Sequence, residues 1–283
     1  MKRQSRDYKS AIKPVWCAGC GDYAVLTAVQ RSLAGLDIPP ENVVTVSGIG
    51  CSGRLSHYLN TYSLHGTHGR AVPISVGVKA ARPDLTVLTV GGDGDGLGIG
   101  GGHIPHAARK NADITYLLVD NRIYGLTKGQ ASPTTPPGEI TKTSPYGVYE
   151  DTLSAVPIFL AYDVSFVARS NTADIDGLQD VITRAIQHRG MSIVCILTMC
   201  RTFRLRDSLW DKATFTPLAP DHDRGDKLAA LELAYSTDPV YTGVFYQVNK
   251  PTLEDHLQAD IRKAESDTGG RPTPVEDLLK SFV

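Results

Sequence analysis

The stretch VGGDGDGLGIGGGHIPHAARKNADITYLLVDNRIYGLTKGQ, residues 90–130, decides the fold class of this chain of 283 residues. Eight of the twelve residues from Gly91 to Gly102 are glycine, and they follow an apolar run. Glycine lets backbone N–H groups approach a ligand closely, so the run predicts a loop that binds a large anion. Asp93 and Asp95 lie inside the run and would repel a bare phosphate. We therefore expect a metal ion between carboxylate and anion.

Outward from this stretch, short apolar or β-branched runs alternate with helical patterns. The expected strands span residues 42–47, 85–90, 114–119, 165–169 and 192–199. The expected helices span residues 22–33, 151–161 and 174–189, with two more ending near Ala81 and Lys110. This alternation predicts an α/β fold with a parallel sheet and helices on both faces.

The expected sheet divides the chain into two parts. Residues 1–205 would form one domain, and residues 206–283 a C-terminal extension that packs on the core or on a partner subunit. Within the domain, residues 121–150 form a long loop with four prolines. A loop of that length in a compact domain is usually functional or covers a partner.

Composition excludes several classes of function. The chain has 29 basic and 30 acidic residues and a formal net charge of -1, so nothing points to nucleic acid or an anionic membrane as a partner. No apolar run approaches the roughly 18 residues of a membrane span, and the N-terminus lacks the apolar core of a secretory signal. Five cysteines, an odd number, argue against a disulfide framework, and we expect a cytoplasmic protein.

One interpretation of the glycine run is a dinucleotide site. Residues 96–101 match G-x-G-x-x-G, and Asp120 ends the next expected strand, where a ribose-binding acid would lie. However, the match begins five residues after the strand, and two aspartates precede it. Each like-charge pair at about 4 Å and an effective dielectric constant near 20 costs on the order of 4 kcal/mol. This interpretation is therefore disfavoured, as is a surface loop without a ligand.

A diphosphate bridged by a metal ion fits the same run better. Asp93 follows one expected strand, and Asn121, 28 residues later, follows the next. Adjacent parallel strands end side by side, so Asp93 and Asn121 can point at one ion. Magnesium prefers oxygen ligands shared with phosphate oxygens, and the backbone carbonyl of Ile123 is well placed as a third ligand.

The cysteines suggest a second metal centre. Cys17 and Cys20 form a CxxC motif, which structural zinc sites, redox dithiols and iron–sulfur clusters all use. Cys51 lies in a second glycine-rich loop, residues 48–53, which should approach the bound cofactor. Cys200 follows the last expected strand, whereas Cys195 lies within it and fits a buried apolar position. A cluster, structural zinc and uncoordinated thiols remain the alternatives.

Five long motifs in one order resemble the β subunits of 2-oxoacid:ferredoxin oxidoreductases. They are WCAGCGDY (16–23), SGIGCSGR (47–54), HGTHGRA (65–71), GGDGDGLGIGGGHIPHAARKN (91–111) and DNRIYGLTKGQASPTTPPG (120–138), and the resemblance covers roughly residues 14–205. It implies a thiamine diphosphate-binding fold in which Asp93, Asn121 and Ile123 hold Mg²⁺. The residues implied to line the cofactor are Ile49, Gly50, Cys51, Ser52, His68, Gly94, Asp95, Gly125 and Leu126. The ligands implied for one 4Fe–4S cluster are Cys17, Cys20, Cys51 and Cys200.

The resemblance also implies a reaction. It is the oxidative decarboxylation of a 2-oxoacid with coenzyme A to acyl-CoA and CO2, in either direction, with electrons passing through the cluster to ferredoxin. An α subunit would complete the active site, supply the carboxylate that activates thiamine, and form an (αβ)2 assembly. The 2-oxoglutarate synthase type is favoured over a pyruvate enzyme. Arg54 is expected to bind a substrate carboxylate, and Lys128 the substrate or coenzyme A.

Two other functions are weighed against this one. A non-redox thiamine diphosphate decarboxylase or carboligase would need none of the four clustered cysteines. A non-catalytic iron–sulfur electron-transfer subunit would need no metal site at Asp93 and Asn121.

Overall fold

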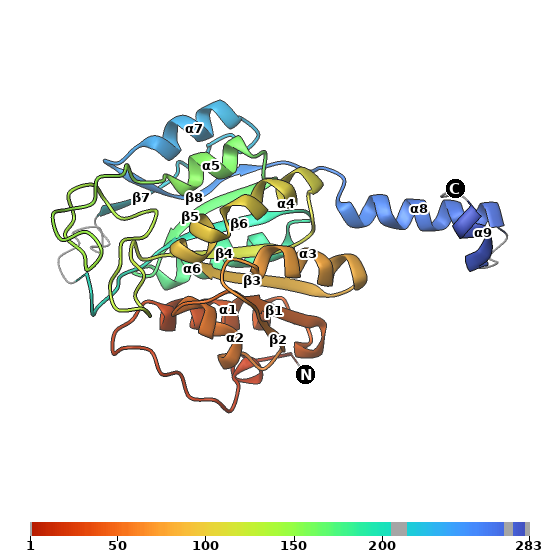
Figure 1. Ribbon diagram of the computed structural model, residues 1–283, viewed down its shortest axis with the longest axis horizontal. Helices are drawn as coiled ribbons and strands as arrows, with labels where there is room; N and C mark the ends of the chain where they lie inside the picture. The colour runs from red at the N-terminus through yellow and green to blue at the C-terminus, as the bar shows by residue number, and fades with distance from the viewer. Residues whose placement is uncertain (1, 205–213, 269–273, 281–283) are drawn as a thin grey trace.

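A computed structural model describes residues 2–204, 214–268 and 274–280. Its centre is one eight-stranded sheet with the order β2-β1-β3-β4-β6-β5-β8-β7 (Figure 1). Strands β1 to β6 are mutually parallel, whereas β8 runs antiparallel to β5 and parallel to β7. The strands are β1 (Val43–Ser47), β2 (Tyr62–His65), β3 (Thr86–Gly92), β4 (Thr115–Asp120), β5 (Phe166–Asn171), β6 (Ser192–Leu197), β7 (Phe215–Pro217) and β8 (Val240–Gln247).

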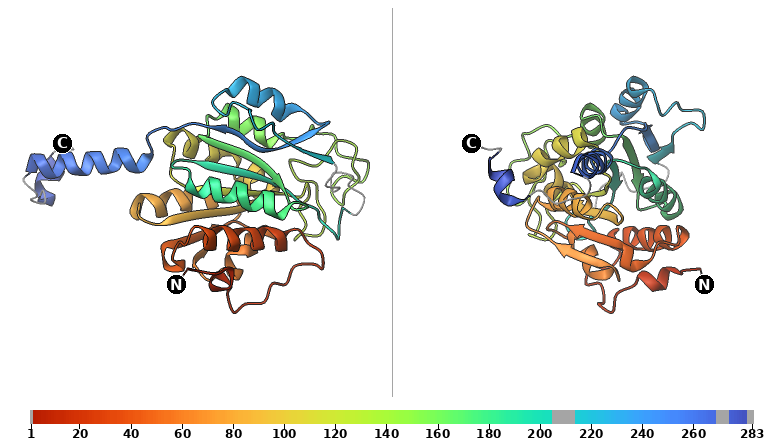
Figure 2. Two further views of the ribbon diagram at one scale, coloured as in Figure 1. Left: turned by 180° about the vertical axis from the view of Figure 1, so that it is seen from behind. Right: turned by 90° about the vertical axis from the view of Figure 1, so that its right-hand side faces the viewer.

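Helices cover both faces of the sheet (Figures 1 and 2). One face carries α1 (Asp22–Gly35), α2 (Leu55–Tyr58) and α6 (Ile175–Gln187). The other carries α3 (Ala71–Ala81), α4 (Ile104–Lys110), α5 (Ala155–Ala161) and α7 (Lys227–Tyr235). Shorter segments are η1 (Ser5–Tyr8), η2 (Pro40–Asn42), η3 (Ser52–Arg54), η5 (Gly101–His103) and the π-helical turn η4 (Gly94–Ile99).

Successive side chains of a strand point to opposite faces of the sheet. On β4, Leu117 and Val119 pack on the α1 and α6 face, whereas Tyr116 and Leu118 pack on the α4 and α5 face. All six residues of β4 are buried, as expected for a parallel strand covered on both sides. The predicted α/β fold with helices on both faces is therefore confirmed.

Two parts of the sheet were not predicted. Strand β2 lies at the sheet edge with all four residues exposed, so it carries no apolar pattern. At the other side, β8 and β7 extend the sheet beyond β5, and α7 packs beside α5. The predicted boundary near residue 205 falls on residues outside the described part of the chain, so the division into domain and extension stays a prediction.

Helix α8 (Leu253–Thr268) projects away from the body of the protein, with α9 (Val275–Lys280) beyond it (Figure 2). Its base is anchored, because the buried Glu254 side chain accepts a hydrogen bond from the Asp113 amide at 3.1 Å. Within the described ranges, none of the helices combines the length and apolar character that crossing a lipid bilayer requires.

Candidate active site

Four loops meet at the carboxyl edge of the sheet, where parallel α/β sheets bind ligands. They follow the neighbouring strands β2, β1, β3 and β4, whose ends are in register because Ser47 pairs with both His65 and Val90, and Gly92 pairs with Val119. The loops line a cavity of about 90 Å³. Its lining comprises Ile49, Gly50, Cys51, Ser52, His68, Gly92, Asp93, Gly94, Asp95, Asn121, Ile123, Tyr124, Gly125, Leu126 and Thr127. Every residue predicted to contact the diphosphate or Mg²⁺ is in this set.

The Asp95 side chain joins two of the surrounding loops to the glycine run. Its buried carboxylate oxygen Oδ1 accepts hydrogen bonds from the Ile49 amide (2.9 Å), the Gly69 amide (2.8 Å) and His68 Nδ1 (2.6 Å). Three donors share Oδ1, so this carboxylate holds the neighbouring loops against the glycine run, while its negative charge still adds to that of Asp93 in the cavity.

Asp93 belongs to a buried pair of carboxyl groups. Thr134 Oγ1 lies 2.8 Å from Asp93 Oδ2 and 2.8 Å from Asp120 Oδ1. Burial, and then the neighbouring Asp120, raise the pKa of Asp93 to about 7. Burial also raises the pKa of Asp120. No Lys, Arg or His forms an ion pair with Asp93 within the described ranges.

A divalent cation suits this pair, because it supplies the positive charge that the buried carboxylates lack. Asn121 Oδ1 lies beside it and accepts the Ile123 amide at 3.1 Å, which leaves a second lone pair for a metal. Sequence reasoning missed Thr134, because it lies 41 residues from Asp93 in the proline-rich loop, and its place in the motif of residues 120–138 does not indicate its role.

Several glycines of the run make room for tyrosine rings. A Cβ on Gly94 would lie 2.2 Å from the Tyr124 ring, and Tyr124 Oη donates to the Gly94 carbonyl at 2.9 Å. A Cβ on Gly96 would lie 2.0 Å from Tyr116 Oη. Gly96, the first glycine of the G-x-G-x-x-G match, is therefore explained by its close packing against Tyr116 of β4. Asp120, the ribose-binding acid of the dinucleotide hypothesis, is buried and bonded to Thr134.

The four predicted cluster cysteines line one cavity of about 230 Å³. Thr202 Oγ1 contacts Cys17 Sγ at 3.1 Å, which joins the segment after β6 to the CxxC loop. A Cβ on Gly125 would lie 3.6 Å from Cys200 Sγ and 3.8 Å from Cys51 Sγ. Cys195 is buried within β6 and lines a different cavity. The structure thus brings Cys17, Cys20, Cys51 and Cys200 together and leaves Cys195 apart.

The residues around the CxxC motif explain its local shape. Gly19 has φ +75°, a conformation that favours glycine, and a Cβ on Gly21 would lie 1.7 Å from Thr198 Oγ1. Trp16 Nε1 donates to the Cys51 carbonyl at 2.7 Å. The two glycines and the tryptophan therefore hold the CxxC loop against the end of β6 and the Cys51 loop.

Two of the clustered thiols need a positive partner in order to ionise. All five cysteines are free, and burial raises the pKa of Cys51 to about 12 and that of Cys20 further. A bound metal centre would supply the positive charge that stabilises the thiolates.

Two cations complete the lining of the cysteine cavity. Arg54 follows the Cys51 loop, and Lys128 lies in the loop after β4 with φ +84°, an uncommon backbone conformation for a non-glycine residue. Cys51, Asn121, Gly125 and Leu126 line both this cavity and the one at Asp93. The two cavities therefore share a wall, and a molecule spanning them would meet the cations at one end.

Comparison with known protein families gives two matches. Residues 48–196 match the thiamine pyrophosphate enzyme C-terminal TPP-binding domain, which contains the Asp93 cavity. Residues 200–260 match the C-terminal region of the pyruvate ferredoxin oxidoreductase beta subunit. The chain thus contains a thiamine diphosphate-binding domain.

Individual relatives agree with these matches. The chain is 46% identical over 201 residues to the 2-oxoglutarate oxidoreductase subunit KorB of Mycobacterium tuberculosis, covering 71% of this chain but only 54% of that protein. It is 43% identical over 261 residues to a 2-oxoacid:ferredoxin oxidoreductase subunit beta of Sulfolobus sp, covering 87% and 86%. The structure superposes with a TM-score of 0.91 and 37% identity on 2-oxoglutarate:ferredoxin oxidoreductase from Magnetococcus marinus, solved with 2-oxoglutarate, coenzyme A and succinyl-CoA bound, over 99% and 96% of the chains.

Proposed function

The chain belongs to the family of 2-oxoacid:ferredoxin oxidoreductase β subunits, and we propose that with an α subunit it oxidatively decarboxylates a 2-oxoacid. Coenzyme A would receive the acyl group, and electrons would leave through a 4Fe–4S cluster to ferredoxin. The observation that carries this proposal is the wall shared by the cysteine cavity and the Asp93 cavity. A cluster in one would lie beside a cofactor in the other, as electron transfer requires.

Different residues would bind the metal ion and the diphosphate, and others would hold the loops of the two cavities in place. Asp93, Asn121 and the Ile123 carbonyl would hold Mg²⁺, and the backbones of residues 49–52, 94–95 and 125–126 would surround the diphosphate. When bound, thiamine diphosphate supplies an electron sink for decarboxylation and the cluster a one-electron acceptor. The chain itself fixes the positions of both: Asp95 ties the Ile49 and Gly69 loops together, and Trp16 holds the Cys51 loop.

An α subunit is part of the proposal because the site lacks one group. Among the described residues, the carboxylates that line the diphosphate cavity are Asp93 and Asp95, and both have other partners. The carboxylate that activates the aminopyrimidine would therefore come from the α subunit, in an (αβ)2 assembly. A reducing cytoplasm would keep Cys17, Cys20, Cys51 and Cys200 free to bind the cluster.

For the substrate, we favour 2-oxoglutarate over pyruvate. Arg54 and Lys128 both line the cysteine cavity, and a second carboxylate on the substrate would give these cations a partner. Pyruvate has no such group. Arg54→Gln should therefore raise the KM for 2-oxoglutarate more than the KM for pyruvate, and equal effects on both would remove the basis for this preference.

The cluster is tested by substituting matched cysteines in the anaerobically purified αβ complex. We expect Cys200→Ser to lose iron and the visible absorbance of the cluster, because its thiol lines the cysteine cavity. Cys195→Ser is the matched control, since that thiol lies within β6 and should leave the iron content unchanged. Full iron content in Cys200→Ser, or its loss in Cys195→Ser alone, would contradict the assignment.

The cofactor is tested separately with Asp93→Ala. This variant should lose thiamine diphosphate binding, measured by calorimetry, while it keeps its iron. Two other functions give different results. A non-redox decarboxylase would release CO2 from a 2-oxoacid without iron or reduced ferredoxin, and an electron-transfer subunit would hold iron but bind no thiamine diphosphate in any form.

A further inference from the structure

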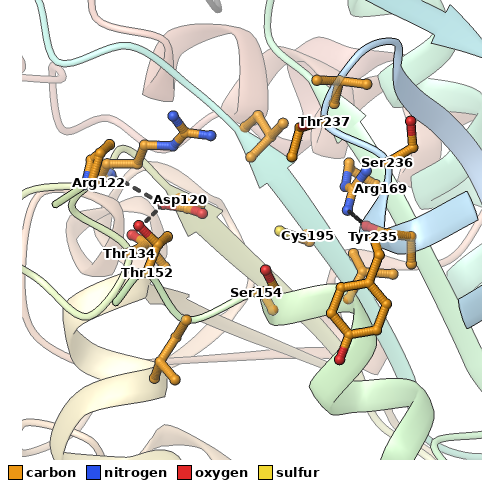
Figure 3. A pocket seen from close by; sticks show the side chains of 17 residues that line it. Asp120, Arg122, Thr134, Thr152, Ser154, Arg169, Cys195, Tyr235, Ser236 and Thr237 are labelled. Atoms are coloured by element: carbon orange, nitrogen blue, oxygen red, sulfur yellow. Dashed lines mark hydrogen bonds between the residues drawn. The ribbon is translucent and has the colours of Figure 1, made fainter. Parts of the chain in front are cut away.

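A third cavity, of about 380 Å³ and larger than the Asp93 and cysteine cavities, lies on the α5 and α7 side of the sheet (Figure 3). It lies between the ends of β4, β5 and β6, the segment before α5, and the turn between α7 and β8. None of the cysteines or cations assigned to the cluster and substrate lines it. Its volume is within the range of small-molecule sites, about 300–1,000 Å³.

One wall carries a buried guanidinium that forms no ion pair, although Asp120 at longer range stabilises its charge. Arg169 on β5 is 9% exposed and donates to the carbonyls of Ala234 (2.9 Å) and Tyr241 (3.3 Å). Its guanidinium also lies 5.2 Å from the centre of the Phe245 ring. No carboxylate forms an ion pair with it within the described ranges. Burying a charged group that forms no ion pair is costly, and an anion bound beside it would offset this cost.

A second arginine lies across the cavity from the first. Figure 3 places Arg122 and Asp120 at one side and Arg169, Tyr235 and Ser236 at the other. In the described part of the chain no carboxylate forms an ion pair with the Arg122 side chain, although its charge partly offsets the rise that burial causes in the pKa of Asp120. Burial, and to a smaller extent the Arg122 charge, lower the pKa of Arg169, whereas Cys195 and Asp120 raise it. Two guanidinium groups that repel each other across a cavity favour an anion between them.

The remaining lining is that of a site for a small polar molecule. Hydroxyl groups of Thr152, Ser154, Ser236 and Thr237 provide donors and acceptors, and Cys195 lies opposite Arg169 on the neighbouring strand β6. The Asp120 oxygen Oδ1 is engaged by Thr134 Oγ1 and the Arg122 amide, at 2.8 and 3.1 Å. Two guanidinium groups and one carboxylate therefore line the cavity, which leaves an excess of positive charge.

We propose that this cavity is a second ligand site that binds a small organic or inorganic oxyanion, a carboxylate or a phosphate, between Arg169 and Arg122. The site is separate from the cavities of the proposed reaction and needs neither the cluster nor thiamine diphosphate. It adjoins them, because Thr134 lines this cavity and bonds to Asp93, and Arg122 lies between Asn121 and Ile123 in the chain. Binding of a ligand in this cavity would therefore affect the proposed metal site through the loop that carries Thr134.

The test is a titration of the purified αβ complex with succinate and, separately, with inorganic phosphate, followed by calorimetry at constant ionic strength with chloride as the reference. We expect saturable binding of at least one probe, and the probe that binds identifies the carboxylate or phosphate class. Arg169→Gln should weaken binding at least tenfold, because an anion bound to two guanidinium groups loses one of them. Arg82→Gln is the matched control, since Arg82 is exposed, pairs with Asp84 and should leave the affinity unchanged.

A second variant tests the same cavity if Arg169→Gln fails to fold. Thr237 is exposed at the cavity, so Thr237→Trp should occlude it without disturbing the core and should also weaken binding at least tenfold. The proposal is overturned if neither probe binds saturably, or if Thr237→Trp and any folded Arg169→Gln both bind with wild-type affinity. An equal loss in Arg82→Gln would likewise overturn it, since the effect would then follow net charge alone.

Discussion

The Asp95 carboxylate should contribute measurably to stability, because three donors from two other loops meet at one of its oxygens. Hydrogen bonds to a charged group contribute about 1.5–3 kcal/mol, and neutral ones about 0.5–1.5 kcal/mol. Asp95→Asn keeps an acceptor oxygen but loses the charge, which costs about 1 kcal/mol per bond. The His68 bond counts for less because its ring is partly exposed. The expected loss in free energy of unfolding is therefore about 2–3 kcal/mol.

Urea unfolding of the purified chain without cofactors measures this loss. The midpoint should fall by on the order of 1 M, with an unchanged slope. Asp84→Asn serves as control: Asp84 pairs with Arg82 at the exposed surface, so its midpoint should hardly move. If Asp95→Asn unfolds at the wild-type midpoint, the three bonds do not hold the loops together. The Kd for thiamine diphosphate should rise in the same variant, because the displaced loops line the cofactor cavity.

Three further predictions follow from the packing. Burial lowers the pKa of His188 below its ordinary 6.5, so the folded protein should lose stability as the pH falls below about 6.5, and His188→Gln should flatten this fall in urea midpoints measured at several pH values. Gly96→Ala would place a Cβ 2.0 Å from Tyr116 Oη and should cost about 1–3 kcal/mol or more, whereas a Cβ on Gly102 meets nothing within 4 Å, so equal melting temperatures of the two alanine variants would contradict the packing. Thr134→Val removes the hydroxyl between two buried carboxyl groups and should cost about 1–3 kcal/mol by urea unfolding; an unchanged midpoint would show that the hydroxyl bonds little in solution.

The sequence predicted the elements whose signal is local. Strands β1, β3, β4 and β6 are mostly apolar or β-branched runs, as expected for strands covered by helices on both faces, whereas β5 is apolar only in its first half. The order of these runs predicted the parallel sheet, and strand ends followed by Asp93 and Asn121 predicted that these residues meet. The edge strand β2 and the antiparallel strand β8 were not predicted. An exposed edge strand needs no apolar pattern, and β8 forms because it pairs with β5, which is distant in the sequence.

What the sequence determined by itself is the set of loops and thiols that come together, because glycine, cysteine and aspartate at fixed positions after strands constrain the backbone and the chemistry locally. What only the tertiary structure decided is the use of each side chain. Asp95 holds neighbouring loops, Thr134 links Asp93 to Asp120 across 41 residues, and Cys200 joins the other thiols while Cys195 stays in the core. Arg169 faces a cavity from within a strand with no motif to mark it. These roles depend on groups far apart in the chain, whose distances are set by packing.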